Sequence, residues 1–271
     1  MPSRRLGQHF LTDRAVAGRI VRAAHISPDH TVVEIGPGRG ALTGMLAAHA
    51  GALTLVEFDA DLAAHLQARY LDKQSVTVVD ADARGIDPVT LPGVGYGPYR
   101  LVSNLPYYAG TPIIRNFLES SHPPEVMVVM VQREVASEMA AVPGKMGMLS
   151  VAMQMYADVE KLFDVPPSAF RPPPKVTSTV VKLIPLGGNR LKLDNTDNFF
   201  RIVRAGFSNP RKQLHNSLAR GLGVEPSWVR PVFEDAGIDS ARRPATLSIA
   251  EWGTLYHAWR NLEIPEAEAA T

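Results

Sequence analysis

The chain has 271 residues, a formal net charge of +1 and 45% hydrophobic residues. This length allows one large or two modest domains with a sizeable core, and the small net charge excludes a uniformly basic surface. The absence of cysteine excludes disulfides, cysteine nucleophiles and thiolate metal sites. We therefore assign no residue to a metal. No apolar run reaches the roughly 18 residues of a membrane-spanning helix, and the basic N-terminus lacks the apolar segment of a signal peptide, so we expect a cytoplasmic protein.

The first half of the chain alternates between helical segments and short apolar runs. Thr12 or Asp13 can cap a first helix that ends near Ala24. Continuous apolar runs predict buried strands at 31–35, 52–56, 76–79, 100–103 and 126–131, and the intervening segments predict helices at 41–50, 60–70 and 111–119. This order predicts an α/β fold, a Rossmann-like parallel sheet with helices on both faces.

After about residue 132 the pattern changes. A short helix is expected at 132–139, the Met-rich run 146–156 is expected in the core, and 159–165 and 176–184 predict two antiparallel strands joined by a proline-stiffened loop. Gly187-Gly188-Asn189 has the composition of a linker, and helical patterns follow at 195–207, 210–220, 226–236 and 248–260. We therefore predict a catalytic domain at 1–186 and a small helical domain at 187–271, whose tail from Ile264 is disordered.

Polar residues follow the predicted strands at the edge where parallel sheets bind ligands. The glycine turn at 36–40 is ambiguous, because it also satisfies the dinucleotide fingerprint with Glu57 as the ribose-binding acid, so an NAD-dependent dehydrogenase is an alternative. Glu34 before the turn and Asp82 after the third strand instead favour S-adenosylmethionine. They offer carboxylates to its amino group and to its adenine amine, and Phe58 would lie beside that adenine.

The segment Asn104-Leu105-Pro106-Tyr107 follows the fourth strand and combines an amide, a rigid turn and an aromatic ring. An amide oxygen and free carbonyls can accept from an exocyclic amine, and a tyrosine face can stack on a base. This combination suits a nucleobase, although the same letters in an arbitrary protein usually form only a turn after a strand.

Seven motifs spread over nearly the whole chain resemble the ribosomal RNA adenine dimethyltransferases. They resemble the small-subunit (KsgA) type more than the Erm type, which acts on large-subunit RNA. The motifs are GQHFL (7–11), VVEIGPGRGALT (32–43), VEFD (56–59), DADA (80–83), NLPYY (104–108), VPPSAFRPPPKVTSTVV (165–181) and FSNPRKQLHNSL (207–218). The resemblance implies that S-adenosylmethionine is the cofactor and S-adenosylhomocysteine the product. The residues assigned to cofactor binding are His9, Leu11, Gly36, Gly38, Glu57, Phe58, Asp82, Ala83 and Asn104.

Two positions depart from the family pattern. His9 stands where the family often has Asn, so protonation of the imidazole could make cofactor binding sensitive to pH. Tyr108 stands where Asn or Gln is common, and nothing in the sequence says what this replacement changes.

The resemblance also implies dimethylation of N6 on two neighbouring adenosines in a hairpin near the 3′ end of small-subunit ribosomal RNA. The expected partner is the assembling small subunit, and the expected state is a monomer. Asn104 and the Leu105 or Pro106 carbonyl would accept the amine hydrogens, and Tyr107 would stack on the base. Phe170 would stack on the other face or, equally, lie in the core. A mainly non-catalytic ribosome-assembly factor remains an alternative.

Local basic clusters are the candidates for RNA contact, because the net charge is so small. The alternative for each cluster is a solvated helix face or a helix cap. The residues assigned to RNA binding are Arg4, Arg5, Arg211, Lys212, Arg242 and Arg243.

Overall fold

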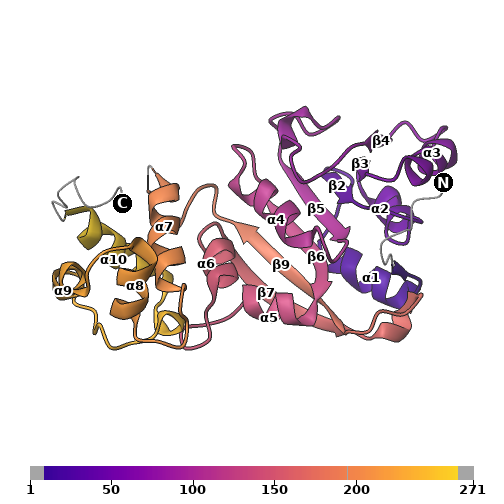
Figure 1. Ribbon diagram of the computed structural model, residues 1–271. Helices are drawn as coiled ribbons and strands as arrows, with labels where there is room; N and C mark the ends of the chain where they lie inside the picture. Colours follow the sequence, from indigo (N-terminus) through magenta and orange to yellow (C-terminus); the bar gives the residue numbers. More distant parts are fainter. Residues whose placement is uncertain (1–8, 194, 262–271) are drawn as a thin grey trace. The chain divides into compact units, whose positions relative to one another are not determined.

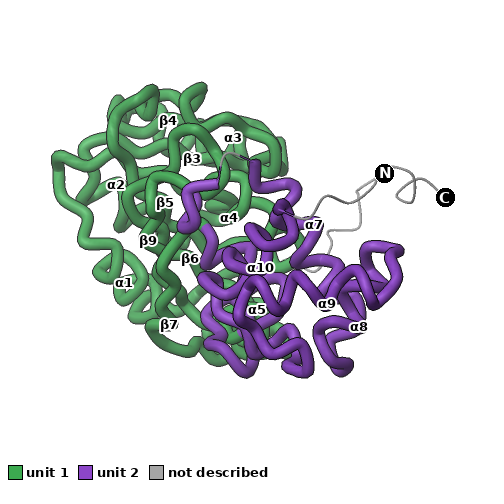
Figure 2. Tube along the Cα trace, turned by 90° about the vertical axis from the view of Figure 1, so that its left-hand side faces the viewer, with its two compact units in different colours: residues 1–137, 156–188 green, residues 138–155, 189–271 purple. Residues whose placement is uncertain are grey.

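The computed structural model describes residues 9–193 and 195–261 (Figure 1). The chain divides into two compact units, residues 1–137 with 156–188 and residues 138–155 with 189–271 (Figure 2). The predicted boundary after residue 186 lies two residues from the change of unit at Gly188. The segment 138–155, however, groups with the second unit, where the Gly144 and Met146 amides donate to the Ala245 carbonyl at 2.7 and 3.2 Å.

The first unit contains a seven-stranded sheet in the order β4-β3-β2-β5-β6-β9-β7. Its first five strands are parallel and have the bounds β4 (Val76–Asp80), β3 (Ala52–Glu57), β2 (Thr31–Ile35), β5 (Tyr99–Asn104) and β6 (Val126–Gln132). The two antiparallel strands expected after residue 132 are present as β7 (Ala157–Val165) and β9 (Ser178–Pro185). They do not form a separate hairpin, because β9 pairs with β6 and extends the sheet.

Helices cover both faces of this sheet, as predicted. Asp13 caps α1 (Arg14–Ala23) by accepting from the Ala15 and Val16 amides at 2.9 and 3.1 Å. One core cluster joins α1, α2 (Thr43–His49) and α3 (Ala60–Arg69) to side chains such as Val32 and Val102. Neighbours of Val102 on β5 point to the opposite face, and the buried side chains of α4 (Gly110–Glu119) lie outside that cluster.

A second, two-stranded sheet joins the beginning of the described chain to the proline-rich loop. In it β1 (Phe10–Leu11) pairs antiparallel with β8 (Phe170–Arg171), with Leu11 opposite Phe170. The Thr12 amide adds a hydrogen bond of 2.8 Å to the Ala169 carbonyl, in the 3-10 turn η2 (Pro167–Ala169). Residues separated by about 160 positions are thereby held together beside the carboxyl edge of the main sheet.

The second unit is helical, and the Met-rich run lies in its core as expected, since Met146, Met153 and Met155 are buried. Its helices are α6 (Met148–Gln154), α7 (Thr196–Gly206), α8 (Leu214–Leu222), α9 (Pro226–Asp235) and α10 (Ile249–Asn261), with a 3-10 turn η3 (Pro244–Thr246). The helix α5 (Arg133–Met139) spans the change from the first unit to this one. A Cβ on Gly221 would stand 2.5 Å from the Ala205 Cα, so glycine lets α7 and α8 pack closely.

The start of α8 differs from the prediction of residue 210. Asn209-Pro210-Arg211-Lys212 forms a turn in which the Lys212 amide donates to the Asn209 carbonyl at 3.0 Å, a conformation that Asn-Pro favours. Within the described ranges no helix combines the length and the apolar character needed to cross a membrane.

Candidate active site

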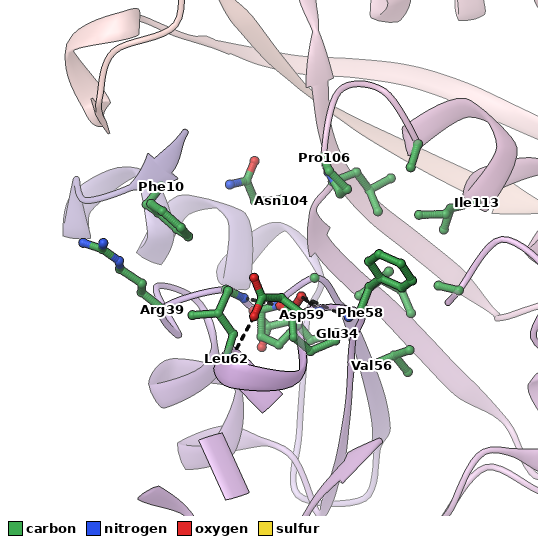
Figure 3. Close-up of a pocket in the computed structure, with 18 of the residues that line it drawn as sticks. Phe10, Glu34, Arg39, Val56, Phe58, Asp59, Leu62, Asn104, Pro106 and Ile113 are labelled. Atoms are coloured by element: carbon green, nitrogen blue, oxygen red, sulfur yellow. Dashed lines mark hydrogen bonds between the residues drawn. The ribbon is translucent and has the colours of Figure 1, made fainter. Parts of the chain in front are cut away.

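A cavity of about 940 Å³ opens at the carboxyl ends of β2, β3 and β5 in the first unit. Figure 3 shows Phe10 and Arg39 on one side of it and Phe58 and Ile113 on the other, with Asn104 above Glu34. The volume is within the range of small-molecule sites. All nine residues assigned from the sequence to the cofactor line this cavity: His9, Leu11, Gly36, Gly38, Glu57, Phe58, Asp82, Ala83 and Asn104.

The turn after β2 places backbone rather than side chains against the cavity. Gly36 and Gly38 have φ values of +60° and +57°, which L side chains rarely adopt. A Cβ on Gly38 would stand 3.2 Å from the Phe10 ring, so β1 packs closely over the turn. Arg39 lies 4.4 Å from the Phe10 ring centroid, close enough for a cation–π contact. Phe10 belongs to the sequence motif GQHFL, but the sequence did not predict that its ring contacts the glycine turn.

Glu57 lies at the end of β3 and is held rigidly by backbone amides. Its carboxylate accepts from the Gly38, Phe58 and Asp59 amides at 2.9, 3.0 and 3.1 Å, and the side chain is buried. Such bonds fix the orientation of the carboxylate. The following Phe58 is 65% exposed and lines the cavity, so an apolar ring stands beside a fixed acceptor.

Glu34 is a second carboxyl group in the same cavity, and it is 2% exposed. Its Oε2 accepts a hydrogen bond of 2.7 Å from the Thr43 hydroxyl. Burial raises the pKa of Glu34 to about 8, a change that the Thr43 bond opposes and the nearby charge of Glu57 increases. The group is therefore mostly neutral at pH 7, and a cationic ligand placed beside it would favour its ionised form.

Asp82 stands at the cavity edge and is paired with Arg84. The Arg84 Nε lies 3.0 and 2.9 Å from the two carboxylate oxygens, and the Arg84 amide adds a bond of 3.0 Å. These hydrogen bonds hold the pKa of Asp82 below its usual value. Asp82 is therefore an oriented carboxylate at the rim, and Arg84 is a partner that the sequence motif did not indicate.

Asn104 ends β5 and lines the cavity, next to the turn at Pro106. The Pro106 carbonyl is already occupied, because it accepts from the Ala109 and Gly110 amides at 3.0 and 2.9 Å. No described residue donates a hydrogen bond to the Leu105 carbonyl. Of the two carbonyls considered from the sequence, only that of Leu105 has no hydrogen-bond donor among the described residues.

Tyr107 is half-buried, and its hydroxyl shares a hydrogen bond of 2.6 Å with the buried Ser178 hydroxyl. Burial raises the pKa of Tyr107, although the Ser178 bond lowers it somewhat. The His9 ring centroid lies 6.0 Å away, and His9 Nδ1 is 2.8 Å from the Pro172 carbonyl. Tyr107 therefore offers the cavity a ring whose hydroxyl is engaged elsewhere.

The stacking role considered for Phe170 does not match its position. Phe170 is 1% exposed, pairs with Leu11 and belongs to the core cluster beneath α1. It does not line the cavity. Since an aromatic ring gains most from complete burial, the structure corrects the stacking assignment in favour of the core alternative.

The residues assigned to RNA contact differ in their surroundings. Arg211, Lys212 and Arg243 are exposed in the second unit. Arg242 is instead engaged inside that unit, where its guanidinium pairs with Glu251 and donates to the Thr246 carbonyl at 2.7 Å. The structure thus gives Arg242 a structural ion pair, and its contact with RNA stays a prediction. Arg4 and Arg5 lie outside the described residues.

The fold and the site define a class before any relative is considered. A Rossmann-like sheet carries a glycine turn, an acid held by backbone amides, a rim acid and an Asn-x-Pro-Tyr turn around one cavity, the arrangement of an S-adenosylmethionine-dependent methyltransferase. Residues 3–258 match the protein family described as "Ribosomal RNA adenine dimethylase". The chain belongs to this family, as the sequence motifs predicted, and it is a methyltransferase that modifies adenine in ribosomal RNA.

Curated relatives and solved structures agree with this membership. The chain is 42% identical to "Ribosomal RNA small subunit methyltransferase A" of Dehalococcoides mccartyi over 92% of this chain and 86% of that protein. The protein of the same name from Desulfitobacterium hafniense is 44% identical over 95% and 92%. A dimethyladenosine transferase from Plasmodium falciparum has a TM-score of 0.76 at 25% identity, over 91% and 96%. The 23S rRNA methyltransferase ErmE has a TM-score of 0.71 at 26% identity, over 93% and 100%.

Proposed function

We propose that this protein transfers methyl groups from S-adenosylmethionine to N6 of two adjacent adenosines in a hairpin near the 3′ end of small-subunit ribosomal RNA. Each adenosine would receive two methyl groups. The observation that carries the proposal is the position of Asn104, at the end of β5, where it lines the same cavity as the glycine turn and Tyr107. An acceptor placed there can hold an exocyclic amine against the cofactor side of the cavity.

The residues present fit this cofactor. The buried Glu57 carboxylate, oriented by three amides, suits the ribose hydroxyls, and Asp82 at the rim suits the adenine amine. Phe58 supplies an apolar face, and Glu34 offers a carboxyl to the amino group of the methionine part. When bound, the cofactor supplies an electrophilic methyl group on a sulfonium.

The chain's own residues act on the adenine amine. The nitrogen is a weak nucleophile, because its lone pair is delocalised into the ring. If Asn104 Oδ1 and the Leu105 carbonyl accept its two hydrogens, the nitrogen becomes more pyramidal and its lone pair turns toward the cofactor side. Positioning and electrostatics therefore supply most of the acceleration. A strong general base is unnecessary, since the amine nitrogen becomes acidic once it is alkylated. The raised pKa of Tyr107 also keeps its hydroxyl protonated at neutral pH, so it does not serve as a base.

The small subunit is the favoured substrate over the large one. The curated relatives at 42% and 44% identity carry a small-subunit name, whereas the large-subunit enzyme ErmE is 26% identical. We also propose that the assembling small subunit, rather than free RNA, is the partner, and that a monomer acts on it in the cytoplasm. A target base must leave its stack to enter the cavity, and this costs a few kcal/mol, less in a loop than in a duplex.

One labelling experiment tests this proposal. Small and large subunits from cells that lack this activity are incubated separately with the protein and methyl-labelled S-adenosylmethionine, and the labelled nucleotides are mapped by mass spectrometry. We expect two neighbouring N6-dimethyladenosines in the small-subunit RNA. Label in large-subunit RNA alone would replace the proposal with the Erm-type activity, and no label in either would contradict both.

A further inference from the structure

Ser178 is a buried polar residue of the 165–181 motif to which no role in binding cofactor or base was assigned above. It is the first residue of β9, it is 0% exposed, and it stands opposite Gln132 of β6 and Val165 of β7. A hydroxyl in such a position needs a hydrogen-bond partner. Its partner is the Tyr107 hydroxyl, 2.6 Å away and 71 positions earlier in the chain.

Tyr107 needs an external constraint, because its own backbone belongs to no strand or helix. It lies between the last residue of β5, Asn104, and the first of α4, Gly110. The amides of Ala109 and Gly110 donate to Pro106, so the local turn fixes the backbone on either side. These bonds leave the direction of the Tyr107 ring open. The Ser178 hydroxyl anchors the ring at its far end.

The same anchor connects Tyr107 to the loop that precedes β9. The Thr177 carbonyl accepts a hydrogen bond of 3.0 Å from the amide of Arg133, the first residue of α5 directly after β6, which fixes the start of β9 against the sheet. Further back in that loop, the Pro172 carbonyl contacts His9 Nδ1, and the His9 ring lies beside Tyr107. The ring of Tyr107 is thus located between a sheet-anchored hydroxyl and a residue that lines the cofactor cavity.

We propose that Ser178 is a positioning residue, which fixes the plane of the Tyr107 ring so that a target adenine stacks with its amine at Asn104. The part of this proposal that concerns adenine rests on the proposed function, whereas the part that concerns the ring does not. Ser178 touches neither cofactor nor base and acts only through Tyr107. Small errors in the placement of a reacting group cost large factors in rate, so one hydroxyl at this point can control turnover.

Four variants test the proposal by their rates. Ser178→Ala and Tyr107→Phe remove the same hydrogen bond from its two ends. We expect each to lower the single-turnover rate of methyl transfer to small subunits by about tenfold to a hundredfold, while the dissociation constant for S-adenosylhomocysteine stays within about twofold. The double variant should be no slower than the slower single variant, because the bond can be lost only once. Ser178→Thr keeps the hydroxyl and should recover most of the rate.

A second measurement needs no RNA. In NMR spectra of protein with 13C-labelled tyrosine, the Tyr107 resonance is identified as the signal that is absent from the spectrum of Tyr107→Phe. We expect Ser178→Ala to lower the order parameter of this ring and to leave the other tyrosines unchanged. Ser150→Ala is the matched control, since Ser150 is equally buried in the second unit and donates to the Glu138 carbonyl at 2.7 Å. It should affect thermal stability but neither the Tyr107 ring nor the rate.

The outcomes separate the two proposals. An unchanged ring order parameter in Ser178→Ala, or rate losses that add fully in the double variant, would overturn the positioning role. A wild-type protein that methylates no small-subunit RNA contradicts the proposed function, and the ring measurement then still decides whether Ser178 positions Tyr107.

Discussion

The Thr43 hydroxyl donates a hydrogen bond of 2.7 Å to the Glu34 carboxyl, and both groups are buried below the glycine turn. Among the described residues this is the one side-chain hydrogen bond to Glu34. It favours the ionised form, but burial outweighs it, so the pKa rises to about 8. The charge of Glu57, at the end of β3, raises the pKa of Glu34 further, and Tyr70, directly after α3, interacts electrostatically with Glu34. Together with Glu57 and Asp82, which line the same cavity, this buried carboxyl is suited to a ligand that carries positive charge.

The first prediction concerns pH and stability. Because the pKa of Glu34 is raised on folding from about 4.5 to about 8, the folded chain binds more protons than the unfolded chain between these values. The stability associated with Glu34 is therefore present below pH 4.5 and is lost as pH rises through 8. Compared with wild type, Glu34→Gln should become relatively more stable as pH increases from 5 to 9, as measured by thermal unfolding. A stability difference that does not change with pH would contradict the raised pKa.

Asn104→Ala should abolish most methyl transfer without disturbing the fold. A strand-tip amide contributes little to the core, whereas the loss of one positioning acceptor typically costs on the order of a hundredfold in rate. Single-turnover transfer to small subunits measures the effect, with Asn198→Ala, an exposed residue of α7, as the control. A folded Asn104→Ala protein with near-wild-type turnover would remove Asn104 as the amine acceptor.

Glu57→Ala should weaken cofactor binding more than RNA binding, because its carboxylate faces the cavity from a rigid set of amide bonds. The change also leaves the Gly38 amide without its acceptor, so we expect a loss of about 1–3 kcal/mol in stability. Calorimetry with S-adenosylhomocysteine measures the affinity, and Glu57→Gln, which keeps one acceptor oxygen, should lie between wild type and alanine. Binding of NADH by the wild type would instead revive the dehydrogenase alternative.

The pair Arg211→Glu with Lys212→Glu should weaken subunit binding and change the logarithmic salt slope by roughly one to two units. Both residues are exposed in the turn before α8, and cofactor affinity should stay unchanged. Arg242→Gln is the contrasting variant. It breaks the pair with Glu251, so it should lower the melting temperature and leave the salt slope as it is. An unchanged slope in the Arg211/Lys212 variant would remove these residues from the RNA surface.

Phe170→Leu and Phe170→Ala separate a core residue from a stacking residue. A buried phenylalanine truncated to alanine typically costs about 3–5 kcal/mol, and leucine, which fills more of the space, should cost less. We expect the leucine variant to be less stable than wild type in denaturant unfolding but to keep its methyl-transfer rate within severalfold below the unfolding transition. A stable leucine variant that transfers methyl groups a hundredfold more slowly would restore the stacking role.

Local sequence was sufficient to predict most helices and strands and many of the residues that line the cavity. Strands such as β2 and β3 are continuous apolar runs, and Gly36 and Gly38 occupy positive-φ positions that few other residues adopt. Because parallel strands end at one edge, Glu57 and Asn104 were expected to meet there, and both line the cavity. These features follow from periodicity and backbone chemistry, which neighbouring residues determine.

Only the tertiary structure decided which partner each ambiguous side chain takes. Phe170 is in the core because β8 pairs with β1, which lies about 160 positions earlier in the chain. Arg242 forms an ion pair because α10 brings Glu251 to it. Ser178 meets Tyr107 because β9 enters the sheet beside β6 rather than forming a separate hairpin. Such contacts depend on loop closure and on the order of strands, and neither leaves a periodic signal in the sequence around the residues that make contact.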